Sequence, residues 1–135
     1  MIAAYIQEMK DVCEEVRASN NPQINAAADA LSAALDDAEA STNFLLDNLK
    51  AGAKQVVLAG ATPYLRLLGL TAGTVYLAKS ALTSDEVHLS DRAALMNFMA
   101  ANLLGETASL RATVENGAET LRHAGSLLAA AAANA

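Results

Sequence analysis

The sequence predicts an all-α protein in which four amphipathic helices pack as one antiparallel up-and-down bundle. Four segments carry uncharged residues at alternating spacings of four and three, which is the pattern of a helix face buried against other helices. Only 2 prolines and 7 glycines interrupt the 135 residues. Aromatic residues make up 4% of the chain, so the β-branched and aromatic surfaces that sheets favour are scarce. Short connections between the segments then favour antiparallel neighbours.

The first two helices are expected at about residues 1–18 and 22–51. The first uncharged stripe consists of Ile2, Ile6, Met9, Cys13 and Val16, and the second of Ile24, Ala28, Leu31, Leu35, Ala38, Thr42, Leu45 and Leu49. Between them lies Pro22, which suits the first turn of a helix. No capping residue precedes Ile2, so we expect the natural chain to continue upstream.

The last two helices are expected at about residues 55–83 and 89–124. Their stripes consist of Val57, Ala61, Tyr64, Leu68, Thr71, Val75, Ala78 and Leu82, and of Leu89, Ala93, Met96, Ala100, Leu103, Thr107, Leu110, Val114, Gly117 and Leu121. Pro63 falls inside the third stripe, so either the helix kinks there or it begins there with Thr62 as its N-cap; we favour a kink, because Val57 and Ala61 keep the phase of the stripe. Residues 1–125 form one domain, Gly125 is a plausible helix stop, and residues 126–135 form an alanine-rich tail that is expected to fray.

Charge and composition narrow the class of protein. The formal net charge is −6, and all of it lies in the first 50 residues, which hold nine acidic and three basic side chains. No basic stripe is available to neutralise phosphates, which argues against nucleic-acid binding. A single cysteine, Cys13, fits a reducing compartment. No uncharged apolar run reaches the ~18 residues of a membrane span, so a cytoplasmic protein without a membrane partner is expected.

A search for reactive groups predicts no catalytic, cofactor-binding or metal-binding residue. The stripes contain no carboxylate, and no Glu-x-x-His pair of the di-iron bundles occurs. Cys13 lies on a stripe, where a thiol acts as a small hydrophobic group. Neither histidine, His88 or His123, is followed by the lysine expected beside a phosphorylated histidine. The carboxylates Asp36, Asp37 and Glu39 are interpreted as solvent-facing charge.

One short segment of the sequence is distinctive enough to be compared with the signatures of known families. Residues 59–70 read AGATPYLRLLGL. This segment resembles the signature AxATPYLRLFG of the extra C-terminal domain in the large acyl-CoA dehydrogenases, the group that includes 3-methylmercaptopropionyl-CoA dehydrogenase. The matching residues are Ala61, Thr62, Pro63, Tyr64, Leu65, Arg66, Leu67 and Gly69. The chain departs from the signature at Leu68, where phenylalanine is common, and near Val75 and Tyr76, where a Gly-Trp pair often occurs.

The resemblance implies a C-terminal helical-bundle domain of an FAD-dependent acyl-CoA dehydrogenase, a flavoprotein oxidoreductase of fatty acid metabolism. In that family the catalytic base and most flavin contacts lie in upstream domains. The resemblance therefore transfers no catalytic or cofactor residue to this chain, which would be a fragment of an enzyme with a structural or interface role. The implied partners are the upstream dehydrogenase domains, acyl-CoA through the parent enzyme, and further copies in a homo-oligomer.

Two residues of the motif are candidates for contacts. Tyr64 lies on the third stripe and is expected to pack between helices. Arg66 points away from that stripe, so it is either solvated, paired within its helix, or used to dock the parent enzyme or an anionic part of acyl-CoA. Gly69 and Gly73 form a face of small residues that favours tight packing inside the bundle, with a ligand groove as the alternative.

Two other functions stay open at this point. A free-standing helical module could offer the acidic first half to a protein partner. A histidine phosphotransfer bundle would use His88 or His123. A flavoprotein domain encoded upstream would support the dehydrogenase interpretation over the free-standing module, and phosphorylation of a histidine by a kinase would support the phosphotransfer bundle.

Overall fold

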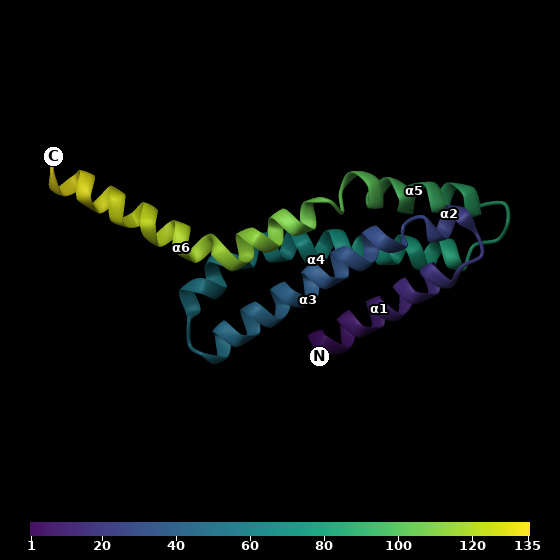
Figure 1. Ribbon diagram of the computed structural model, residues 1–135, viewed down its shortest axis with the longest axis horizontal. Helices are drawn as coiled ribbons and strands as arrows, with labels where there is room; N and C mark the ends of the chain where they lie inside the picture. Colours follow the sequence, from purple (N-terminus) through teal and green to yellow (C-terminus); the bar gives the residue numbers. More distant parts are fainter.

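The computed structural model describes all 135 residues, and the all-α prediction is confirmed (Figure 1). The helices are α1 (Ile2–Ala18), α2 (Pro22–Asn25), α3 (Ala28–Lys50), α4 (Lys54–Leu82), α5 (Leu89–Asn102) and α6 (Glu106–Ala133). The ends of α1 and α4 agree with the expected helices to within a residue or so. The second and fourth expected helices are each divided in two, so four uninterrupted helices are not observed.

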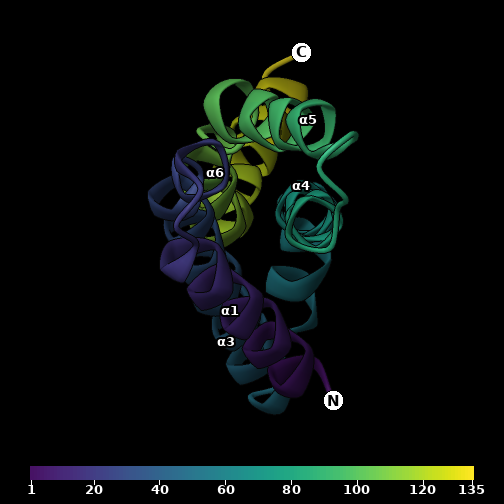
Figure 2. The same ribbon diagram turned by 90° about the vertical axis from the view of Figure 1, so that its right-hand side faces the viewer.

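Helix α4 lies at the centre of the arrangement. It contacts every other helix, α2 least of all, whereas α1 and α6 do not pack on each other (Figures 1 and 2). Helices α5 and α6 share one side of the molecule, because α5 covers the C-terminal part of α4 beside α2 and α6 covers its N-terminal part beside α3. The long helices α3 and α4 run in opposite directions, as the three-residue link between them requires.

The first division separates α2 from α3 at Ala26 and Ala27. Pro22 starts α2, and the Asn21 side chain caps it by accepting a hydrogen bond from the Gln23 N–H at 2.9 Å. The Asn25 amide donates to the Ser19 carbonyl at 3.2 Å, which ties this single turn to the end of α1. The backbone is extended at Ser19 and Asn21, between α1 and α2, whereas Ala26 and Ala27 keep helical backbone angles where α2 leads into α3.

The second division separates α5 from α6 at Leu103–Gly105. The N–H groups of Leu103 and Leu104 both approach the Met99 carbonyl at 3.0 Å, so the helical register is lost at this point. Gly105, a poor helix former, follows directly. As a result Leu104 enters the core at 3% exposure, while Leu103, which the fourth stripe predicted, is half-buried.

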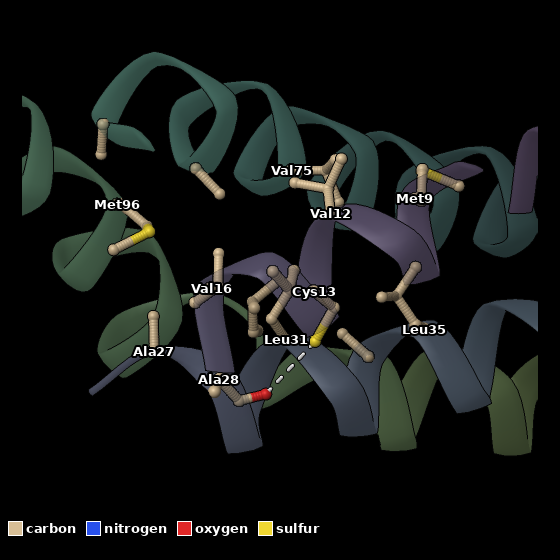
Figure 3. Close-up of a cluster of buried hydrophobic side chains, with 14 of the residues drawn as sticks. Met9, Val12, Cys13, Val16, Ala27, Ala28, Leu31, Leu35, Val75 and Met96 are labelled. Atoms are coloured by element: carbon tan, nitrogen blue, oxygen red, sulfur yellow. Dashed lines mark hydrogen bonds between the residues drawn. The ribbon is translucent and has the colours of Figure 1, made fainter. Parts of the chain in front are cut away.

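The largest core cluster joins α1, α2, α3, the C-terminal half of α4, and α5 (Figure 3). Its members are aliphatic or sulfur-containing: Ile6, Met9, Val12, Cys13, Val16, Ile24, Ala27, Ala28, Leu31, Ala34, Leu35, Val75, Ala78, Ala81, Met96 and Leu104. The predicted stripe residues of α1 and α3 are buried almost without exception. Alanines in this cluster allow the helices to approach closely with few aromatic side chains.

The buried face of α4 is rotated relative to the stripe that the sequence predicted. The most buried residues include Gly60, Leu67 and Thr74, each one position before a predicted stripe residue. Thr71 and Val75 are buried as expected. Because α4 has neighbours on several sides, its buried surface is wider than one stripe and spacing alone does not identify its centre.

The helix α4 continues through Pro63 from Lys54 to Leu82, so it does not begin at Thr62. Proline has no N–H to donate, so the Ala59 carbonyl loses its partner within the helix. This carbonyl lies toward Gly117 of α6, 3.9 Å from where a Cβ of residue 117 would stand. The small residue at 117 therefore leaves room for the free carbonyl.

Helix α6 does not stop at Gly125 but extends to Ala133. The expectation of a frayed tail from residue 126 is therefore not met, because an alanine-rich segment has high helix propensity and continues the preceding turns. Every residue from Glu119 onward is exposed, and this half of the helix projects away from the other helices (Figure 1). We refer to residues 119–133 as the overhang of α6.

By length and composition alone, α4 is one helix that could cross a membrane. Few of its residues are fully buried, although it contacts all the other helices. Its apolar character is explained in part by these contacts and in part by an exposed uncharged face, described below.

Candidate interface around the α4 motif

The segment AGATPYLRLLGL forms the N-terminal half of α4, where α4 packs between α3 and α6. Gly60 is the closest point of this packing. A Cβ at residue 60 would stand 2.9 Å from Leu45 Cδ2 and 3.4 Å from both Val114 Cγ1 and the Val114 carbonyl. The absence of a side chain at residue 60 lets Leu45 of α3 and Val114 of α6 lie directly against the α4 backbone, so the motif first serves helix packing.

Tyr64 joins α4 to α3. Its hydroxyl lies 2.8 Å from Thr42 Oγ1, and Thr42 in turn donates to the Ala38 carbonyl at 2.7 Å. Because the threonine has one hydroxyl hydrogen and uses it for Ala38, the Tyr64 hydroxyl is the donor to Thr42. The expectation that Tyr64 packs between helices agrees with this position, and its polar end is used inside the protein.

We expect Tyr64→Phe to lower the free energy of unfolding by about 0.5–1.5 kcal/mol, because Thr42 loses a hydrogen bond while the ring stays in place. The measurement is urea denaturation followed by circular dichroism. Thr62→Val, which removes an exposed hydroxyl from the same helix, is the control. Equal stability of Tyr64→Phe and the wild type would show that the hydroxyl pair does not contribute.

Arg66 joins α4 to α6. Its Nε and Nη2 atoms both lie 2.8 Å from Glu106 Oε2, and Glu106 stands in the first turn of α6. Neither a freely solvated arginine nor a pair within one helix is observed, since Glu106 is 40 residues away in the sequence. Both side chains are substantially exposed, so this ion pair contributes little to stability. An anionic ligand of Arg66 would have to displace Glu106.

A second polar contact between helices lies beside this one and was not expected from the sequence. Asp37 of α3 accepts a hydrogen bond from the Thr107 hydroxyl at 2.9 Å and lies 3.5 Å from Arg111 Nη1. Its side chain is only 15% exposed, so the interpretation of Asp37 as solvent-facing charge is wrong. No pattern in the sequence could indicate these contacts, because Thr107 and Arg111 lie 70 or more residues from Asp37 along the chain. Asp36 is exposed as expected, and Glu39 pairs with Lys10 at 2.7 Å.

The remaining candidate reactive groups do not come together. Cys13 is buried, its thiol lies 3.6 Å from the Ala28 carbonyl (Figure 3), and burial raises the pKa of the thiol. His88 is exposed and bonds through Nδ1 to Asp85 at 2.7 Å, which lowers the pKa of that carboxyl. His123 is exposed on the overhang of α6. No group of three or more His, Cys, Asp or Glu side chains is placed to share a metal ion.

This chain's largest described hollow does not fit a flavin. The hollows of the chain are open, and the largest has a volume of about 530 Å³. That hollow lies between Ala59 of α4 and the α6 residues Ser109, Ala112, Thr113, Asn116, Gly117, Thr120 and Leu121. No cation and no glycine-rich loop faces it to hold a pyrophosphate.

Gly69 and Gly73 are not packed inside the molecule. A Cβ at either position would meet nothing within 4 Å, so the expectation of tight packing at these residues is wrong. They belong to a continuous exposed face of α4 without charged residues, which we call the outer face of α4. It consists of the exposed residues Leu58, Thr62, Leu65, Gly69 and Tyr76 and the half-buried Gly73. Leu58, Leu65 and Tyr76 are 75%, 68% and 58% exposed, so a large apolar area is open.

These features define an all-α domain whose motif residues join helices to one another and whose most apolar helix keeps an open face. The family model described as "Acetyl-CoA dehydrogenase C-terminal like" matches residues 5–124. The chain belongs to this family of acyl-CoA dehydrogenase C-terminal domains, which confirms the resemblance seen in the α4 motif. No curated protein and no solved structure matches the chain.

Proposed function

We propose that this chain acts as the C-terminal helical-bundle domain of an FAD-dependent acyl-CoA dehydrogenase, with a structural and interface role and no catalysis of its own. The supporting observation is that the motif residues are used internally. Tyr64 bonds to Thr42 and Arg66 to Glu106, so neither is free for the substrate. Family membership supplies the class of the parent enzyme.

The outer face of α4 is the surface that we assign to docking on the upstream dehydrogenase domains. Its uncharged residues span five turns of the helix, from Leu58 to Tyr76. Charge reaches this face at its Tyr76 end, where the Lys79 ammonium lies 5.7 Å from the centre of the Tyr76 ring and pairs with Glu8 of α1 at 2.8 Å. FAD and acyl-CoA would be bound by the parent domains, and this chain would influence them only through the docked contact.

The docking proposal predicts that Leu65→Lys in the full-length dehydrogenase lowers its thermal stability and weakens its hold on FAD, because a charge enters an apolar contact. Leu65 is 68% exposed in this chain, so the isolated domain should keep its own melting temperature. The measurements are flavin fluorescence during heating of the holoenzyme and circular dichroism of the domain.

The matched control is Leu95→Lys, which replaces an exposed leucine of α5 outside the outer face. Leu95→Lys should leave the holoenzyme unchanged. If both variants melt like the wild-type holoenzyme, the outer face does not dock the parent. If no flavoprotein domain precedes the chain in its gene, the dehydrogenase assignment itself fails and a free-standing interaction module takes its place.

A further inference from the structure

A hollow of about 240 Å³ lies where α5 ends and α6 begins, beside the N-terminal half of α3. None of its lining residues belongs to α4, so it is separate from the outer face of α4. The only charged side chain in its lining is that of Asp37, and we call it the Asp37 hollow. Its walls consist mainly of methyl groups from alanines of three helices: Ala30, Ala33, Ala100, Ala101 and Ala108.

The Asp37 carboxylate is mostly buried, yet few firm donors reach it. A carboxylate has about four positions for hydrogen bonds. Thr107 has one hydroxyl hydrogen, and its oxygen lies 2.9 Å from both Asp37 Oδ2 and the Leu104 carbonyl, so that hydrogen is shared. Arg111 Nη1 is 3.5 Å from Asp37 Oδ1, whereas Arg111 Nε donates to Glu115 at 2.8 Å. A carboxylate whose side chain is 15% exposed therefore keeps acceptor positions for a further donor.

The C-terminal end of α5 adds two neutral acceptors to the same hollow. The N–H groups of Leu103 and Leu104 both approach the Met99 carbonyl, and no backbone N–H donates to the carbonyls of Ala100 and Ala101. Carbonyls at the end of a helix point beyond its last turn and carry partial negative charge. Because both alanines line the Asp37 hollow, one carboxylate and two carbonyls gather there, and this set of acceptors favours a cation.

We propose that the Asp37 hollow binds a primary ammonium group carried on a short aliphatic chain. An ammonium group has three donors and no acceptor, which suits one carboxylate and two carbonyls. The aliphatic chain would lie along the alanine methyl groups. A calcium ion suits the hollow less well, because it takes about 6–8 oxygen ligands and the methyl groups supply none. A lysine side chain of another protein and a free alkylamine both have this chemistry.

Titration of the 135-residue chain with n-butylammonium, followed by the amide signals in NMR spectra, tests the site directly. This probe has the four methylene-type carbons and the ammonium group of a lysine side chain. The signals of Ala33, Ala101, Gly105 and Ala108 should move together, with a Kd of about 1–10 mM for so small a ligand. Ammonium chloride, which lacks the chain, and butanoate, which has the opposite charge, should bind at least about 10-fold more weakly.

Three variants separate the site from general attraction of cations to an acidic protein. Asp37→Asn should weaken binding about 10-fold or more, because the ammonium loses its charged acceptor while the shape is retained. Asp36→Asn is the matched control, since it removes the same charge from an exposed neighbour that lines a different hollow, and it should bind like the wild type. Ala33→Leu keeps Asp37 and changes an exposed position, but it should also weaken binding because it fills the space for the aliphatic chain.

A lysine with a blocked backbone, Nα-acetyl-lysine methylamide, identifies the source of the ammonium group. Binding of this compound as well as n-butylammonium would assign the hollow to a lysine of another protein, whereas binding of n-butylammonium alone would assign it to a small amine.

Three results would overturn the proposal: no shift of these signals at about 50 mM n-butylammonium, equal binding by Asp37→Asn and the wild type, or equal binding of ammonium chloride. None of them bears on docking through the outer face of α4, which is tested by Leu65→Lys in the holoenzyme.

Discussion

Leu35→Asp is expected to abolish the cooperative unfolding transition of this domain. Leu35 is 1% exposed in the core cluster that joins α1, α3 and α4 (Figure 3). The substitution removes about 1.5–3 kcal/mol of apolar burial and adds the cost of a buried carboxylate without a partner. Because a small domain is stable by only about 5–15 kcal/mol, most of its stability would be lost. Thermal melting by circular dichroism measures this.

Two comparisons with other substitutions to aspartate test whether the effect of Leu35→Asp is due to burial. Leu49→Asp, in the same helix at 55% exposure, should melt within a few degrees of the wild type. Leu104→Asp should be severe, whereas Leu103→Asp should be milder, because the break after α5 places Leu104 and not Leu103 in the core. If Leu103→Asp were the more damaging of the pair, the register at this break would be different from the one described.

Gly60→Leu is the second substitution with a large expected effect. Even the first carbon of a side chain at residue 60 would approach Leu45 Cδ2 to 2.9 Å, and the Val114 backbone carbonyl is 3.4 Å away. Leu45 can move its flexible end, but a leucine would also meet the α6 backbone. Overpacking of this kind costs about 1–3 kcal/mol, so we expect a lower midpoint of urea denaturation.

The same change at Gly69 is the matched control, since it lies in the same helix. Nothing stands within 4 Å of a Cβ at Gly69, and leucine is the better helix former by about 0.8–1 kcal/mol. Gly69→Leu should therefore unfold at a higher urea concentration than the wild type. Opposite shifts for the two glycines would establish which one brings helices together. Shifts of the same sign would contradict the assignment.

The same pair of glycines shows where prediction from the sequence ended. Small residues one turn apart at Gly69 and Gly73 indicate close packing, yet they face outward, while Gly60, at the variable position of the signature, makes the close contact. Spacing identifies residues that share a face of a helix. It does not identify which face meets a neighbour when the helix, like α4, has neighbours on several sides.

The candidate site also has features that the sequence predicted and contacts that it did not. The motif identified the family, and the stripe placed Tyr64 between helices. The partner of Arg66 is Glu106 and a partner of Asp37 is Thr107, separated by 40 and 70 residues. No local pattern connects residues that far apart, because such contacts exist only after three helices have packed together.

The sequence by itself determined the helical class, the approximate ends of α1 and α4, the buried stripes of α1 and α3, and the family. These properties depend on local propensity and on the 3.6-residue period, which neighbouring residues fix. Only the tertiary structure decided the breaks before α3 and α6, the close contact at Gly60, the open outer face of α4 and the overhang of α6. Those depend on where segments distant in the chain meet, and on which surfaces remain uncovered once they have met.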